Sequence, residues 1–122
     1  MNKFSAIALA SVLMWSGMGS AAADEVDTGA GKERLSQGKA IAFDRNKGNC
    51  LSCHMMDDGE LPGNSGPPLM MMQARFPDRA TLREQIYDAR TRNPNTAMPP
   101  YGSHRILSDE ELDLVVDYVH SL

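Results

Sequence analysis

Cys50-Leu51-Ser52-Cys53-His54 is the stretch of this chain that decides its fold. Two cysteines separated by two residues and followed directly by histidine form the C-x-x-C-H pattern of covalent haem attachment. One helical turn presents both thiols to the two vinyl groups on one porphyrin edge, and the next residue projects its imidazole toward the iron. We therefore expect one covalent haem c, attached to Cys50 and Cys53, with His54 as an axial iron ligand.

Other uses of the cysteine pair fit the sequence less well. A disulfide across so short a loop would restrict the unfolded chain rather little. A thioredoxin-like redox pair would follow a strand, and no strand pattern precedes Cys50. A zinc site needs four ligands, and only His104 and His120 remain to complete one.

A methionine far along the chain is the candidate for the sixth iron ligand. Met98 lies in the segment NPNTAMPPYG, residues 93–102, directly before Pro99 and Pro100. The two prolines fix their φ angles and remove two N–H donors, so this segment is a rigid, extended loop that can hold a thioether in one place. The alternative is a methionine that only fills space in the core.

The chain has nine methionines, and three of them are rivals to Met98. Met70, Met71 and Met72 are expected to be packing residues on one short helical turn around the flat cofactor. Met55 and Met56 adjoin His54 and cannot easily reach the opposite haem face. His104 and His120 are further alternatives, although an exposed or structural histidine is more common. Met70, Met71 and Met72, and the two histidines, are therefore secondary candidates.

Support for the histidine ligand is expected from Gly66-Pro67-Pro68-Leu69. A ligating histidine usually donates its second ring N–H to a carbonyl or carboxylate, and the Pro67 carbonyl is our candidate for that acceptor. Leu69 would then pack against the haem face. An ordinary loop turn with a buried leucine remains open for this segment.

The first residues predict export. Residues 1–23 carry Lys3, an apolar run and a small-residue end at Ala21-Ala22-Ala23, which together are typical of a secretory signal. We expect a soluble periplasmic protein.

The formal net charge of −4 argues against nucleic-acid or anionic-membrane partners. Arginines at positions 75, 79, 83, 90 and 92 could meet an acidic partner, or form a solvated helix face.

The remaining pattern predicts an all-α domain over residues 32–122. Helices are expected over residues 32–43, with Gly38 at a close helix crossing near Tyr118, over residues 78–89 with Asp78 as the cap, and from the capping box Ser108–Glu111 onward. Long loops rich in proline and glycine, residues 59–68 and 93–102, would wrap the haem. Residues 24–31 are expected to be disordered.

Four blocks of this chain carry a family resemblance. They are GKAIAFDRNKGNCLSCH (residues 38–54), GELPGNSGPPL (59–69), RFPD (75–78) and NPNTAMPPYGSHRIL (93–107). Together these blocks resemble SoxX, the monohaem cytochrome subunit of the SoxAX complex of periplasmic sulfur oxidation. The resemblance covers most of the mature chain. C-x-x-C-H is shared by all such cytochromes, so the blocks around Pro67 and Met98 carry the discrimination.

The resemblance implies a class I cytochrome c fold, with His54 and Met98 as axial ligands and a SoxA subunit as heterodimer partner. The complex would act as an L-cysteine S-thiosulfotransferase that joins thiosulfate to a cysteine of the SoxYZ carrier and passes electrons to a downstream acceptor. Both cysteines here would be consumed by haem, so this chain would hold no catalytic residue. A free-standing electron shuttle is the alternative, and a ligand sensor would need an open sixth position.

Overall fold

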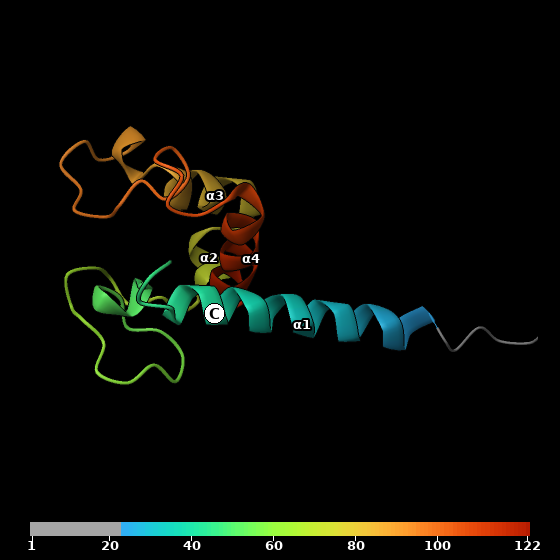
Figure 1. Cartoon of the computed structure of the whole chain (residues 1–122). Helices are drawn as coiled ribbons and strands as arrows, with labels where there is room; N and C mark the ends of the chain where they lie inside the picture. The colour runs from blue at the N-terminus through green and yellow to red at the C-terminus, as the bar shows by residue number, and fades with distance from the viewer. Residues whose placement is uncertain (1–22) are drawn as a thin grey trace, which may run out of the picture.

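The computed structural model describes residues 23–122, with side chains from residue 29 onward. Within that range the helices are α1 (Ala23–Phe43), α2 (Met72–Arg75), α3 (Arg79–Tyr87) and α4 (Asp109–His120), and the 3-10 turns are η1 (Cys50–Ser52) and η2 (Ala89–Thr91) (Figure 1). This part of the chain holds no β-strand, only an isolated parallel bridge between Met56 and Leu69. The predicted all-α class is confirmed. The predicted signal lies outside the described residues except for its last residue.

Helices α1 and α4 form the main packing contact, and Gly38 is where they meet. A methyl group at this position would lie 2.1 Å from the carbonyl oxygen of Leu114 and 2.8 Å from Cβ of Tyr118. Only a residue without Cβ lets the two backbones approach this closely. The predicted crossing is confirmed.

Local signals set where α3 and α4 begin. The Asp78 carboxylate accepts a hydrogen bond from the N–H of Ala80, 3.0 Å away, at the start of α3. Ser108 and Glu111 form the predicted capping box at the start of α4. Such caps satisfy N–H groups that have no partner inside the helix. Helix α4 then buries the apolar stripe of Leu112, Leu114, Val115, Val116, Tyr118 and Val119.

The start of α1 differs from the expectation. Residues 24–31 were expected to be disordered, and the structure instead continues α1 through them, so that this end of the helix projects beyond the other helices (Figure 1). Residues 29–34 are exposed. Extending a helix is easier than starting one, so the packed residues near Gly38 provide a nucleus from which the helix extends backward.

The arginines of α3 pair with carboxylates of this same chain. Arg79 Nε lies 2.5 Å from Asp117 Oδ1, and Arg83 Nε lies 2.8 Å from Asp113 Oδ1. Arg34 of α1 reaches the other oxygen of Asp117 at 2.5 Å. Two members of the arginine cluster, Arg79 and Arg83, therefore meet the carboxylates of helix α4, and together with Arg34 these pairs connect three helices.

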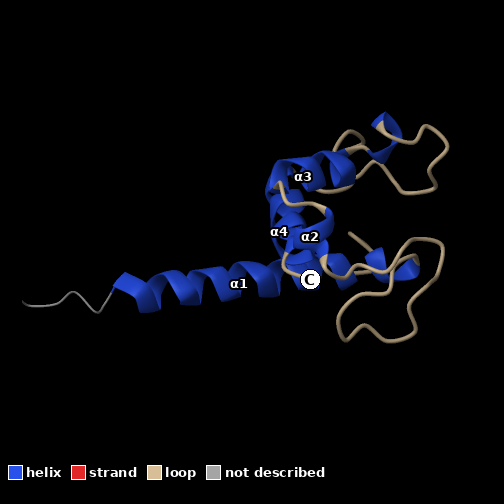
Figure 2. Cartoon of the chain, turned by 180° about the vertical axis from the view of Figure 1, so that it is seen from behind, coloured by secondary structure: helices blue, strands red, loops and turns tan. Residues whose placement is uncertain are grey.

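Two long loops leave the helical part on the same side, as both views show (Figures 1 and 2). Residues 44–71 connect α1 to α2, and residues 88–108 connect α3 to α4. Beneath them, Leu82 and Ile86 of α3 pack with Val115 and Val119 of α4 in the buried core. In residues 23–122, no helix combines the length and apolar character needed to cross a bilayer.

Candidate functional site

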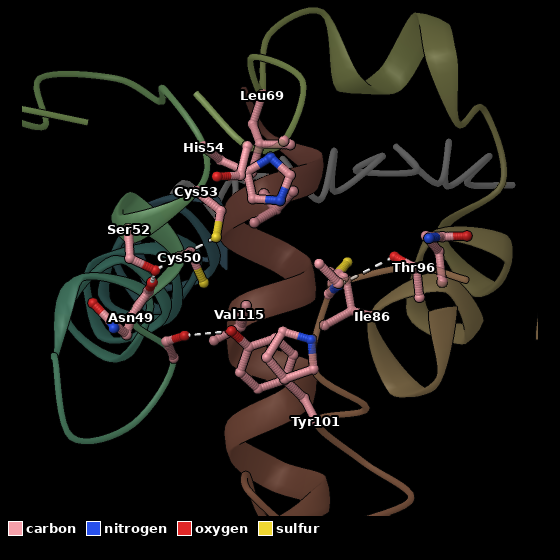
Figure 3. Close-up of a pocket in the computed structure, with 18 of the residues that line it drawn as sticks. Asn49, Cys50, Ser52, Cys53, His54, Leu69, Ile86, Thr96, Tyr101 and Val115 are labelled. Carbon is pink, nitrogen blue, oxygen red and sulfur yellow. Dashed lines mark hydrogen bonds between the residues drawn. The ribbon is translucent and has the colours of Figure 1, made fainter. Parts of the chain in front are cut away.

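A cavity of about 690 Å³ lies between the two loops, with α4 behind it (Figure 3). Its apolar walls come from both loops and from the helical core, including Leu69, Leu82, Ile86, Leu107 and Val115. Cofactor sites typically measure about 300–1,000 Å³ and are mostly apolar, with a few placed polar groups. The cavity therefore has the size and character of a site for a large flat cofactor.

The two cysteines stand side by side on one wall of this cavity. Turn η1 brings the N–H groups of Cys53 and His54 to the Cys50 carbonyl, at 3.2 and 2.9 Å. Both thiols are free and line the cavity, toward which Figure 3 shows them pointing. Burial raises the pKa of the Cys50 thiol to about 11. One turn thus presents two thiols and the next residue's imidazole to the same space.

The imidazole of His54 is held by the proline-rich segment later in the same loop. Its Nδ1 lies 2.7 Å from the carbonyl oxygen of Pro67. With Nδ1 donating to that carbonyl, Nε2 carries the free lone pair that a metal ligand needs. The bond is the one expected from the sequence, while iron ligation by His54 stays a prediction.

Leu69 is half-buried and lines the cavity beside this histidine. Its N–H donates to the carbonyl of Met55 at 2.8 Å, directly after His54 in the chain. Together with the Met56–Leu69 bridge, this bond ties the proline-rich segment to the histidine segment. Leu69 is therefore placed where it could contact a bound haem face.

Met98 lines the same cavity from the other loop. Its side chain is half-buried, and its N–H donates to Thr96 Oγ1 at 3.1 Å. Pro99 and Pro100 follow in non-helical backbone, as expected from the sequence. Met98 is available to the cavity as a ligand, and that role stays a prediction.

The expectation of one short helical turn carrying Met70, Met71 and Met72 is wrong. Met71 has a left-handed backbone with φ of 52° and precedes α2, which begins at Met72. Met72 is 1% exposed and lines the cavity, whereas Met70 and Met71 are 50% and 70% exposed. Since the left-handed residue turns the chain, only one of the three side chains reaches the core. Met72 is thus the one cavity-lining rival to Met98 among them.

The other two histidines stand apart from the cavity lining. His104 is exposed, and His120 Nε2 lies 2.9 Å from the carbonyl oxygen of Phe76. Among the described residues, no three His, Cys, Asp or Glu side chains are grouped so that they could hold a metal ion. A zinc centre built on Cys50, Cys53 and His54 therefore has no fourth ligand of those types there.

Tyr101 is a cavity residue that the sequence analysis missed as an individual residue. It is 8% exposed, and its hydroxyl donates to the Gly48 carbonyl at 2.6 Å. Burial raises the pKa of this hydroxyl, which keeps it protonated as a donor. The signal for it was slight, a lone aromatic residue directly after two prolines. No local pattern identifies Gly48 as its partner.

These residues fit one covalently attached haem. The cavity offers two adjacent free thiols, an imidazole with its second nitrogen already bonded, a thioether from the facing loop and apolar walls. Covalent haem needs that set of groups and no further metal ligand. Cys50, Cys53, His54 and Met98 would hold it, with Leu69 and Ile86 among the wall residues.

Comparison with known proteins agrees with this geometry. Residues 33–119 match the family model described as cytochrome c oxidase, cbb3-type, subunit III. The chain is also 35% identical over 75 residues to an uncharacterized lipoprotein of Aquifex aeolicus (strain VF5), an alignment covering 61% of this chain and 36% of that protein. The family match runs from α1 to α4 and includes both loops. The chain therefore belongs to this cytochrome c domain family and carries haem c with iron, bound covalently.

Proposed function

We propose that this chain is the haem subunit of a SoxAX-type complex in the periplasm. The complex attaches thiosulfate oxidatively to a cysteine of a SoxYZ-type carrier, and this subunit accepts the released electrons. When bound, haem supplies a centre that gains and loses one electron reversibly. The chain is thus a subunit of an L-cysteine S-thiosulfotransferase that acts mainly as an electron carrier.

The observation that carries this division of labour is the position of the cysteines. Cys50 and Cys53, the two cysteines of the chain, both line the haem cavity. Forming a sulfur–sulfur bond requires a reactive thiolate, and a thiol converted to a thioether cannot provide one. The catalytic cysteine therefore belongs to the SoxA-type partner, and this chain contributes no catalytic residue.

The blocks on which the SoxX resemblance rests support the assignment because they build the site. Arg75 and Phe76 come from the RFPD block, and Pro67 and Leu69 from the preceding block. The block at residues 93–107 contributes a larger set of lining residues, namely Asn93, Asn95, Thr96, Ala97, Met98, Pro99, Tyr101, Ile106 and Leu107. A family likeness confined to the surface would carry less weight for function.

The chain's own residues suit an electron acceptor. His54 and Met98 would hold the iron from two loops, and the apolar side chains of Leu69, Ile86 and Val115 line the cavity around it. Methionine ligation raises the iron potential relative to ligation by two histidines. Thiosulfate attachment releases two electrons, so the complex uses sequential transfers or a second centre.

A free-standing electron shuttle is the second candidate, and the family match supports it as well. A cytochrome c domain with one haem suffices to carry electrons between two proteins. The chain covers about a third of the length of its Aquifex aeolicus relative, so that relative does not decide between the two functions.

Native purification with mass spectrometry separates the two candidates. The protein is isolated from the periplasm without cross-linking, its mass is measured, and thiosulfate-dependent haem reduction is assayed with a SoxYZ-type carrier present. The complex predicts co-purification with a second cytochrome and reduction that requires it. A monomer whose haem is reduced by other donors, and never by thiosulfate plus carrier and partner, overturns the proposal in favour of the shuttle. A Cys50→Ser, Cys53→Ser variant without covalent haem serves as the blank.

A further inference from the structure

One hydrogen bond joins the two loops that form the cavity. The hydroxyl of Tyr101 donates to the carbonyl of Gly48 over 2.6 Å, and both residues are buried. Tyr101 follows Met98 by three residues, and Gly48 precedes Cys50 by two. Figure 3 shows the bond at the side of the cavity away from His54. The bond therefore links the candidate sixth ligand to the segment that holds the haem covalently.

The connection from Tyr101 to Met98 is stiff. Pro99 and Pro100 lie between them, and proline has no free φ rotation. The backbone of Tyr101 is fixed on both sides, because its N–H donates to the Pro99 carbonyl at 3.0 Å and its carbonyl accepts from Ile106 and Leu107 at 2.9 and 3.1 Å. Displacement of Tyr101 is therefore transmitted to Met98 rather than absorbed between them.

The other end of the bond is anchored to a helix. Gly48 donates its N–H to the carbonyl of Ile41 in α1, 3.1 Å away. On the opposite side of Met98, residues 91–95 are exposed and the bonds among the described residues are local: the N–H of Met98 donates to Thr96 Oγ1, Thr96 donates to the Asn93 carbonyl, and Asn93 donates to the Ala89 carbonyl. Helix α1 thus restrains the methionine loop through Gly48 and Tyr101.

We propose that Tyr101 is a positioning residue that keeps Met98 on the haem iron. The inference rests on Met98 being the sixth ligand and is independent of the sulfur chemistry. Without the hydroxyl, the Gly48 carbonyl is buried with no partner, and a buried polar group left unpaired is costly. In an open loop that carbonyl reaches water and Met98 leaves the iron. Loss of the hydroxyl therefore reduces the free-energy difference that favours the closed loop.

The test is competition by imidazole for the sixth position in the oxidised holoprotein. Added imidazole replaces Met98 only when the loop opens, so its apparent affinity reports the opening equilibrium. Tyr101→Phe keeps the ring and should raise that affinity about tenfold. Tyr118→Phe is the matched control: Tyr118 is also buried with one hydroxyl bond, to Asp57 at 3.3 Å, but stands outside the cavity lining. Its imidazole affinity should match that of the parent protein.

Further readouts separate this inference from the ligand assignment. Met98→Ala should abolish the methionine-to-iron charge-transfer band and bind imidazole most tightly; an unchanged band shows that Met98 is no ligand. If that band is lost but Tyr101→Phe binds imidazole within twofold of the parent, the role of Tyr101 is overturned and the ligand stands. Should Tyr101→Phe fail to accumulate with haem, NMR of the parent decides. Imidazole binding should shift the ring signals of Tyr101 and leave those of Tyr118, and no shift at Tyr101 contradicts the proposal.

Discussion

The imidazole of His54 packs directly against the backbone of Gly66. A methyl group at residue 66 would lie 2.3 Å from Cε1 of the ring and 2.6 Å from Nδ1. These separations are far shorter than a van der Waals contact, so only glycine allows the ring its observed place. The next residue, Pro67, then offers its carbonyl to Nδ1. The two neighbours therefore fix the orientation of the imidazole together.

Gly66→Ala should push His54 away from the Pro67 carbonyl. We expect the free energy of unfolding of the holoprotein to fall by about 1–3 kcal/mol, with an altered absorption spectrum if, as predicted, the displaced imidazole is an iron ligand. Chemical denaturation and visible spectroscopy measure the two effects. Ser65→Ala, at the exposed neighbouring residue, is the control. A Gly66→Ala protein with the parent's spectrum and stability would contradict the steric argument.

Gly38→Ala should separate helices α1 and α4. The new methyl group would meet the Leu114 backbone, and such overpacking costs about 1–3 kcal/mol. Gly31→Ala on the same helix is the matched control, since a methyl group there meets nothing within 4 Å. It should be neutral or stabilise the protein by up to about 1 kcal/mol. Equal effects of the two substitutions in denaturant melts would show that the crossing is not tight.

Protonation of Asp117 should account for part of the loss of folding stability in acid. Burial opposes its ionisation, but hydrogen bonds from Arg79 and Arg34 outweigh burial and hold its pKa below the usual value. A carboxylate with a lowered pKa contributes stability above its unfolded pKa of about 3.9, and that contribution is lost as pH falls through the lower, folded value. Asp117→Asn should therefore be about 1 kcal/mol less stable at pH 7 and show a shallower decline below about pH 4.

Urea melts at several pH values measure this dependence. Glu110→Gln, also in α4, is the control, because Glu110 is exposed and forms no ion pair with the described side chains. Its acid limb should follow that of the parent protein. An Asp117→Asn acid limb as steep as the parent's would mean that other carboxylates dominate.

Alanine substitutions of Met72 and Met98 should distinguish a methionine that packs in the core from one that ligates iron. Met72→Ala removes a side chain that is 1% exposed, so unfolding should require about 2–5 kcal/mol less while the methionine–iron band stays. Met98→Ala should abolish the band. Met70→Ala, at a half-exposed position, should change neither band nor stability by more than about 0.5 kcal/mol. Loss of the band in Met72→Ala alone would reverse the two roles.

Features that depend on neighbours in the sequence could be predicted from it. The capping box of Ser108 and Glu111 and the Asp78 cap involve residues at most three apart. Their geometry is the same at the start of any helix, so the sequence pattern alone predicts it. The same holds for the turn that aligns Cys50, Cys53 and His54. Gly38 could be assigned to a helix crossing because a glycine inside a helix is costly unless another backbone comes close.

Predictions failed where the outcome depended on the path of the chain. Nothing local distinguishes Met72 from Met70 and Met71, yet the left-handed backbone at Met71 buries the first and exposes the others. Residues 24–31 have a composition typical of disorder, yet they form the first part of helix α1. The later part of that helix packs against α4.

The sequence by itself determined the cofactor and its attachment, because thioether spacing and helix caps act over a few covalently linked residues. The tertiary structure alone decided that Tyr101 bonds to Gly48, that the ring of His54 packs against Gly66, and that Arg79 pairs with Asp117. Each of these contacts joins residues from different segments. Their meeting depends on how helices and loops pack around the cavity, which no local pattern of residues encodes.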